Sequence, residues 1–330
     1  MTLPAWLLLH FGIGVSATWL ARRYALRRQL LDHPGERRSH AVPTPRGGGI
    51  SIVAALLAAV AWSWWQFPSN TWIPFFATGL VLVAGIGLVD DHRPLSPWFR
   101  LAVHALASGC LAAASWTELR DPAFALLAFA ATMVLTNAWN FMDGIDGIAA
   151  SQALLVALAI AMLAAGPVRW LALALAAAVA GFLPFNAPKA SVFLGDVGSG
   201  ALGFTVAALA VRANGSQQSP AWLLALPLSA FLVDTGLTLL GRVVRGEPWW
   251  RAHVLHAYQR WVRRCGRHMP VTLAYAGWTM ASMALLFALL HWKFEVPTIF
   301  VACAAWYMTG ALAWWMLQRK GTDAAMENLE

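Results

Sequence analysis

The stretch WLALALAAAVAGFLPF, residues 170–185, carries no charged side chain and runs directly into the polar segment NAPKASVFLGDVGSG, residues 186–200. Similar apolar runs recur along the 330-residue chain, separated by short polar segments. A membrane-spanning helix needs about 20 such residues. Hydrophobic residues make up 59% of the chain and charged residues only 12%, against roughly a quarter charged in a soluble domain. The sequence therefore predicts an all-α, polytopic integral membrane protein with a single transmembrane domain over residues 1–330.

About eleven membrane spans can be placed along this chain. Their expected centres lie near Leu8, Leu57, Val81, Ala107, Phe129, Leu158, Leu175, Ala207, Leu228, Leu285 and Trp306. The first apolar run, residues 3–20, has no basic residue before it and no small-residue cleavage site after it. We therefore expect it to be a span and not a removable signal peptide. An odd number of spans places the two termini on opposite sides of the membrane.

Basic residues are divided unequally between the two sets of loops that eleven spans create. Of the 23 Lys and Arg residues, all but Arg120, Arg169, Arg212 and Lys293 fall in one set. In bacterial inner-membrane proteins the loops rich in Lys and Arg face the cytoplasm. We therefore expect a multi-pass inner-membrane protein with a periplasmic N-terminus and a cytoplasmic C-terminus. This loop bias accounts for the net charge of +8, so no nucleic-acid partner is expected.

The basic loop at residues 242–270 contains a short amphipathic pattern. Trp250, Val254, Trp261 and Cys265 recur at helical spacing while arginines occupy the other faces. This pattern predicts an interfacial helix between residues 248 and 265, on the cytoplasmic side. The three cysteines of the chain are far apart and odd in number. They indicate neither a disulfide framework nor a cysteine-based metal site.

Four of the expected cytoplasmic loops carry polar motifs. They read VDDHRPLS (89–96), NAWNFMDGIDG (137–147), PFNAPKASVFLGDVGSG (184–200) and RAHVLHAYQR (251–260). An ionised carboxylate near hydrocarbon is costly unless it is paired or binds a metal. Asp and Asn oxygens without Cys favour Mg²⁺ or Mn²⁺ over Zn²⁺, and His and Arg suit phosphate oxygens. A metal-and-phosphate site on the cytoplasmic face is the simplest joint interpretation.

Each motif also has a plainer interpretation. Asp90 and Asp91 could be the solvated end of a helix, and the Asn residues could satisfy backbone groups. His253 and His256 could be exposed members of the interfacial helix. Asp234, inside the ninth expected span, could be either a buried polar partner or a wall of the site.

Together the motifs resemble those of the polyprenyl-phosphate N-acetylhexosamine-1-phosphate transferase superfamily, which is MraY- and WecA-like and is glycosyltransferase family 4. The resemblance extends from TPRGGG (44–49) through HVLHAYQR (253–260), and NFMDGIDG (140–147) and VFLGDVGSG (192–200) are its most specific parts. Chain length and HAYQ look more like the O-antigen-initiating WbpL and WbcO branch. The resemblance implies transfer of an N-acetylaminosugar 1-phosphate from a UDP-sugar to undecaprenyl phosphate, with release of UMP, in O-antigen or related envelope polysaccharide synthesis.

The resemblance also implies roles for individual residues. The expected catalytic residues are Asp90, Asp91, Asp143, His253 and His256, the expected substrate-binding residues are Asp146, Asn186, Phe193, Arg260 and Arg46, and the expected metal ligands are Asn140 and Asp196. Mg²⁺ is the implied cofactor, with Mn²⁺ as an alternative. Within this set Phe193 would stack on uracil, with Asp146 and Asn186 as hydrogen-bond partners.

The phosphate groups would be held on the other side of the implied site. His253, His256 and Arg260 would hold the pyrophosphate or the acceptor phosphate. A phosphate monoester is already largely ionised at neutral pH, so orientation of the acceptor is the expected main role of Asp90. A lysine of the MraY group has no clear counterpart here, although Arg46 lies nearby.

Two other classes of protein compete with the transferase. Span-end acids also mark ion and substrate pathways in transporters, and a chain with these motifs could be an inactive scaffold of an envelope assembly. The sequence does not fix the sugar: the branch resemblance favours UDP-QuiNAc or UDP-FucNAc type donors, with UDP-GlcNAc close behind. A homodimer in the lipid bilayer is compatible with the sequence.

Overall fold

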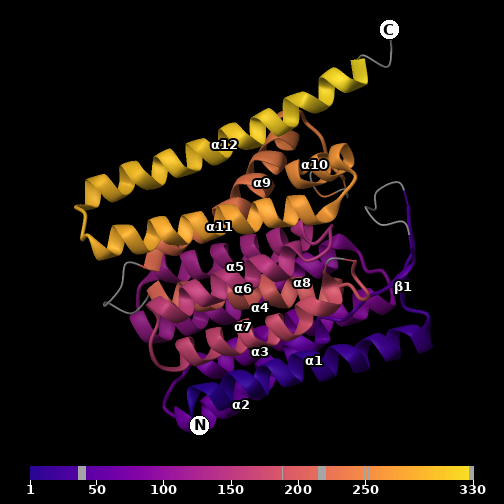
Figure 1. The fold of residues 1–330 in the computed structure, drawn as a ribbon. Helices are drawn as coiled ribbons and strands as arrows, with labels where there is room; N and C mark the ends of the chain where they lie inside the picture. The colour runs from indigo at the N-terminus through magenta and orange to yellow at the C-terminus, as the bar shows by residue number, and fades with distance from the viewer. Residues whose placement is uncertain (36–41, 188, 215–220, 249, 251–252, 327–330) are drawn as a thin grey trace.

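The computed structural model describes residues 1–330 except 36–41, 188, 215–220, 249, 251–252 and 327–330 (Figure 1). The first half is built from α1 (Leu3–Arg28), β1 (Leu31–Asp32), β2 (Thr44–Pro45), α2 (Ile50–Gln66), α3 (Trp72–His92), α4 (Pro97–Leu119), α5 (Pro122–Met142) and α6 (Ile148–Leu163). The second half is built from α7 (Gly166–Asn186), α8 (Gly195–Asn214), a 3₁₀ turn (Ala221–Leu224), α9 (Ala225–Val244), α10 (Ala257–Cys265), α11 (His268–His291) and α12 (Val296–Met326).

The all-α prediction is confirmed, and each of the eleven expected span centres falls in its own helix. Seven helical segments in the described part of the chain are long and apolar enough to cross a membrane, and α2 and α6 are shorter apolar helices. The chain is therefore a multi-pass membrane protein. That all eleven helices cross the bilayer, with the N-terminus outside, stays a prediction.

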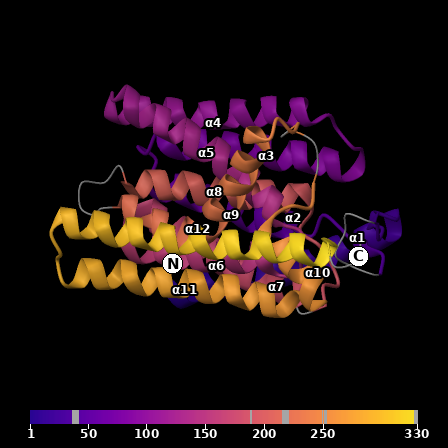
Figure 2. The same cartoon turned by 90° about the horizontal axis from the view of Figure 1, so that it is seen from above.

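The helices pack side by side into one bundle, with α1 and α2 at one edge and α12 at the other (Figure 1). In the view turned by 90°, α4 lies along one edge of the bundle (Figure 2). At its centre α5 packs on α8, and both α1 and α6 pack on α7. Small residues permit these close approaches, as is usual between membrane helices. A Cβ atom at Gly14 of α1 would collide with the carbonyl oxygen of Ala178 in α7, and one at Gly203 of α8 would collide with that of Leu135 in α5.

Two loops from distant parts of the chain join next to the start of α8. β1 and β2 pair antiparallel, and Phe193 N donates to Pro45 O at 2.8 Å. Gly48 N and Gly49 N donate to Phe193 O and Leu194 O, both at 2.9 Å. The TPRGGG segment is thus fixed by backbone hydrogen bonds to the residues that lead into α8.

The predicted interfacial helix is shorter than expected. Within the expected range of residues 248–265, residues 253–255 are not helical and α10 begins only at Ala257, while residues 249 and 251–252 lie outside the described residues. The buried face of α10, formed by Ala257, Tyr258 and Val262, packs on α9, α11 and α12. The prediction of a helix from residue 248 was wrong because a contact with α9, described below, sets where the helix begins. Its placement at the membrane surface stays a prediction.

Candidate active site at one end of the bundle

A cavity of about 560 Å³ opens at one end of the bundle, where the four polar motifs meet. This volume is typical of small-molecule sites. The sequence-predicted residues that line it are Arg46, Asp91, Asn140, Asp143, Asp146, Asn186, Phe193, Asp196, His253 and His256. The other two predicted residues, Asp90 and Arg260, are not among its described lining residues. The structure therefore brings ten of the predicted side chains to one place, while the role of each stays a prediction.

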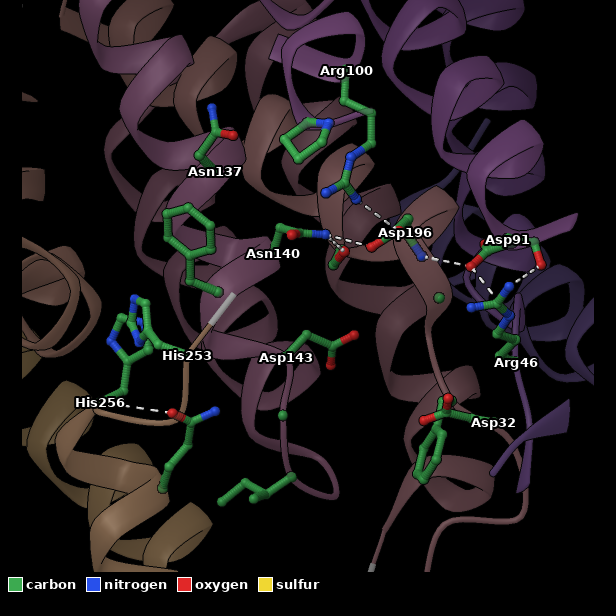
Figure 3. Close-up of a pocket in the computed structure, with 18 of the residues that line it drawn as sticks. Asp32, Arg46, Asp91, Arg100, Asn137, Asn140, Asp143, Asp196, His253 and His256 are labelled. Carbon is green, nitrogen blue, oxygen red and sulfur yellow. Dashed lines mark hydrogen bonds and ion pairs between the residues drawn. The ribbon is translucent and has the colours of Figure 1, made fainter. Parts of the chain in front are cut away.

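Asp196, at the start of α8, lies at the centre of a polar cluster (Figure 3). Asn140 Nδ2 donates to Asp196 Oδ1 at 2.6 Å and to Ser199 Oγ at 3.1 Å. The preceding Gly195 has φ +72°, and a Cβ atom there would lie 2.5 Å from Asp91 Oδ2. Only glycine allows the chain to turn this tightly into α8 beside a carboxylate.

Asp91 holds the first turn of α8. Its Oδ1 accepts from Asp196 N at 3.0 Å and its Oδ2 accepts from Val197 N at 3.2 Å. The Arg46 guanidinium donates to the Asp91 carbonyl, and Arg46 Nε lies 4.0 Å from Asp91 Oδ1. A carboxylate is favoured at a helix N-terminus, where backbone N–H groups lack partners. Both Asp91 oxygens are therefore engaged in placing Asp196, and Arg46 balances their charge.

Arg100 of α4 is a site residue that the sequence reasoning missed. Its Nη1 donates to Asp90 Oδ2 at 2.9 Å and to Asp196 Oδ2 at 3.1 Å. The other Asp90 oxygen accepts from Leu95 N at 2.6 Å. Asp90 thus reaches the cavity indirectly, through a guanidinium shared with Asp196. The sequence did contain a signal for this residue, because Arg100 is a cation only nine residues after the Asp90–Asp91 pair. The loop-charge argument used Arg100 only as evidence for membrane orientation.

Asp143 faces the middle of the cavity (Figure 3) and makes no hydrogen bond to any described residue. Burial, followed by the charges of Asp196, Asp91, Asp146 and Asp32, raises the pKa of Asp143 well above its usual value. The cavity therefore gathers carboxylates around a carboxyl group that has no cationic partner among the described residues.

Asp146 and Asn186 join the loops that form another wall of the cavity. Asn186 Oδ1 accepts from Gly147 N and its Nδ2 donates to Val192 O, both at 3.1 Å. Asp146 Oδ2 accepts from Ala190 N at 3.1 Å, and Asp146 Oδ1 lies 3.2 Å from His268 Nδ1. His268, at the start of α11, also lines the cavity and was not predicted. No sequence motif marks it, because only the packing of α11 brings it there.

His253 and His256 form an imidazole pair beside the cavity, with ring centroids 4.8 Å apart. Burial, followed by the positive charges of His256 and Arg242, lowers the pKa of His253 to about 4. The His253 ring is therefore neutral at neutral pH. Arg260 donates to Gln318 O at 3.1 Å, which ties α10 to the end of α12. A phosphate contact by Arg260 stays a prediction.

Acidification should lower the free energy of unfolding of the wild-type protein more than that of the His253→Gln variant. An unfolded imidazole binds a proton near pH 6.5, whereas folded His253 binds one only near pH 4. The unfolded state therefore holds more protons in this window, and stability falls as the pH drops through it. Melting temperatures in detergent should be measured at about pH 7.5 and about pH 5. Between these pH values the melting temperature should fall less for the variant than for the wild type. A pH-independent difference would contradict the lowered pKa.

Comparison with known proteins agrees with the motifs. The profile of Glycosyl transferase family 4 matches residues 73–214, which include α3, α8 and the loops between them. A decaprenyl-phosphate N-acetylglucosaminephosphotransferase of Mycobacterium tuberculosis is 31% identical over 308 residues, covering 79% of this chain and 76% of the relative. An undecaprenyl-phosphate alpha-N-acetylglucosaminyl 1-phosphate transferase of Thermotoga maritima is 33% identical, covering 54% of this chain and 56% of the relative.

A third relative represents another activity within the same chemistry. A phospho-N-acetylmuramoyl-pentapeptide-transferase of Ruegeria pomeroyi is 30% identical, covering 58% of this chain and 66% of the relative. These similarities do not test the expected likeness to the WbpL and WbcO branch, which stays a prediction. Because the first relative is similar over most of both chains and the family profile includes the central motifs, this chain belongs to the polyprenyl-phosphate N-acetylhexosamine-1-phosphate transferase superfamily.

Proposed function

We propose that the protein transfers an N-acetylaminosugar 1-phosphate from a UDP-sugar to undecaprenyl phosphate. An oxygen of the lipid phosphate attacks the β-phosphorus of the UDP-sugar. The bond between the β-phosphorus and the bridging oxygen breaks, UMP leaves, and a lipid diphosphate sugar remains. The observation that carries this proposal is the cavity in which Asp196, Asn140, Arg100 and the imidazole pair meet, at one end of a bundle of apolar helices.

The donor atoms around Asp196 fit Mg²⁺ bound partly by substrate. Among the described residues, no group of three His, Cys, Asp or Glu side chains could hold a metal ion. Mg²⁺ is often bound by one or two carboxylates together with substrate phosphates. In our proposal Asp196 and the Asn140 carboxamide oxygen would hold the ion, and Asp143, which has no hydrogen bond to a described residue, lines the same cavity. When bound, the ion would neutralise the charge that develops on the phosphates.

The remaining residues of the cavity position the two substrates. Arg100 keeps two carboxylates paired, which lowers their mutual repulsion as anionic phosphates enter. Neutral His253 can donate one hydrogen bond to a phosphate oxygen without an added charge, and His256 lies beside it. Phe193, with Asp146 and Asn186, is proposed to bind uridine on the opposite wall. Asp90 acts through Arg100 to orient the acceptor.

Release of UMP by purified protein is the test of this function. The assay combines undecaprenyl phosphate, Mg²⁺ and the UDP derivatives of GlcNAc, GalNAc, QuiNAc and FucNAc. We expect metal-dependent UMP release with at least one donor, and no release when the lipid phosphate is omitted. The Mycobacterium tuberculosis and Thermotoga maritima relatives are named for N-acetylglucosamine, whereas the branch resemblance favours QuiNAc or FucNAc. No UMP with any donor would rule out the proposed reaction and leave a transporter or an inactive scaffold.

The same reaction tests the proposed orientation in the inner membrane. A UDP-sugar does not cross a sealed bilayer. Inside-out vesicles should therefore consume added donor directly, whereas right-side-out vesicles should do so only after detergent is added. The opposite pattern would place the cavity in the periplasm. The proposed place in O-antigen or related polysaccharide synthesis depends on which donor is used.

A further inference from the structure

Asp234 is a buried carboxylate of α9 that does not line the cavity in the described structure. Its Oδ1 accepts from Ala257 N at 2.8 Å, and its Oδ2 accepts from Tyr258 N at 3.1 Å and from the Tyr275 hydroxyl at 2.7 Å. Thr238 Oγ1 is 3.3 Å from Oδ1. One side chain thus joins α9 to the first turn of α10 and to α11. It is the buried polar partner, and not the cavity wall, of the two alternatives that the sequence left open.

His256, immediately before α10, lies between Asp234 and the cavity. It is only 2% exposed, yet it lines the cavity. Its Nδ1 is 3.5 Å from Asp234 Oδ1, an ion-pair distance, and makes no hydrogen bond to a described atom. The His256 side chain also faces the backbone N–H of Gln259 in a capping-box arrangement. The ring is flanked by His253 and by Phe141, with centroids at 4.8 and 6.1 Å. The backbone N–H of His256 donates to Gln259 Oε1 at 3.3 Å. The ring edge that carries Nδ1 therefore faces both the Asp234 carboxylate and the first turn of α10.

We propose that Asp234 is a positioning residue that acts through His256. Its carboxylate fixes the start of α10 and accepts the Nδ1 proton of the imidazole, so that Nε2 is the ring nitrogen available to the cavity. The partner of one ring nitrogen determines the tautomer and leaves the other nitrogen for chemistry. This inference rests on the proposed function, in which His256, with a proton on each ring nitrogen, donates from Nε2 to a phosphate oxygen of one of the substrates.

The charge of Asp234 is the part of this arrangement that helix capping does not require. Neutral Asn and Ser side chains cap helix N-termini about as well as Asp does. An ionised carboxylate is costly to bury without compensation, and here two backbone amides, two hydroxyls and an imidazole surround it. The imidazole is the one group among them whose tautomer and charge respond to the carboxylate. An Asp at residue 234 is therefore best explained by its action on His256.

The test is a double-mutant cycle on UMP release. Asp234→Asn keeps the shape of the side chain but loses the charge, and we expect it to lower kcat at least about thirtyfold. Tyr275→Phe, the matched control, removes another donor to the same carboxylate and should cost less than about threefold. In a His256→Ala background, adding Asp234→Asn should lower kcat by no more than about threefold, because the effects of two residues that act through one another do not add. A full further loss in that background would show that Asp234 acts by general support of the fold, and would overturn the proposal.

A second measurement does not depend on activity. Nitrogen-15 NMR of labelled histidines should show His256 protonated at Nδ1 in the wild type and shifted toward the Nδ1-unprotonated tautomer in Asp234→Asn. An unchanged His256 signal would overturn the proposal. If Asp234→Asn does not fold, Asp234→Glu, which keeps the charge but moves it, serves in both measurements. An inactive wild type with the expected His256 signal would refute the proposed function and leave the positioning role standing.

Discussion

Asp196→Asn should lower turnover by at least about a thousandfold while leaving the amount of folded protein unchanged. The variant keeps the size of the side chain, and the backbone N–H that Asp91 accepts is untouched. What it removes is the negative charge next to Asn140 and Arg100. If Asp196 holds the metal ion, this charge is essential to catalysis and dispensable for folding. UMP release measured with saturating Mg²⁺ would show the loss, and size-exclusion profiles would report on folding.

Asp121→Asn is the matched control for this variant. Asp121 is exposed and caps the start of α5 through its side chain, and Asn serves this purpose equally well. We expect wild-type turnover from the control. Wild-type turnover from Asp196→Asn as well would show that the metal assignment is wrong.

Arg100→Ala should reduce kcat/KM about a hundredfold. Without the guanidinium, the carboxylates of Asp90 and Asp196 lose the cation that they share, and their repulsion opposes the entry of phosphates. Arg100→Lys should recover part of the loss, because an ammonium group restores the charge but not the planar fork. Steady-state kinetics with both substrates varied would separate weaker binding from slower turnover.

Arg93→Ala serves as the comparison for Arg100→Ala. Arg93 lies in the loop just before α4 and is exposed, so the variant removes an equal charge outside the Asp90 and Asp196 contacts. Its kinetics should stay within about twofold of wild type. Equal losses in the two variants would mean that the total charge of the loop matters, and not the contact with Asp90 and Asp196.

The fold was largely predictable because a long apolar run in a bilayer must satisfy its backbone hydrogen bonds internally, and one helix does so. The site motifs were predictable for a related reason, since polar groups at span ends demand partners. Arg100 and His268 were missed because the sequence gives no contact between either residue and the acidic motifs; the short distance of Arg100 from Asp91 was the one available signal. Only the packing of α4 and α11 brings them to the cavity.

The start of α10 also could not be predicted from the sequence, in this case because the sequence pattern predicted too long a helix. The helical spacing of Trp250, Val254 and Trp261 predicted a longer helix, but Asp234 accepts from the amides of Ala257 and Tyr258. A carboxylate more than twenty residues away in sequence thus sets the boundary. Side-chain spacing reports which residues share a face, but it carries no information about a partner on another helix.

The joining of the TPRGGG segment to residues 193–194 also bears on the order of biogenesis. Gly48 and Gly49 leave the ribosome early, yet their carbonyl partners belong to Phe193 and Leu194. During synthesis the first loop can therefore form these hydrogen bonds only after the six helices α2 to α7 have been made. Asp196 follows two residues after Leu194, so the proposed metal site at Asn140 and Asp196 cannot be complete on a shorter nascent chain.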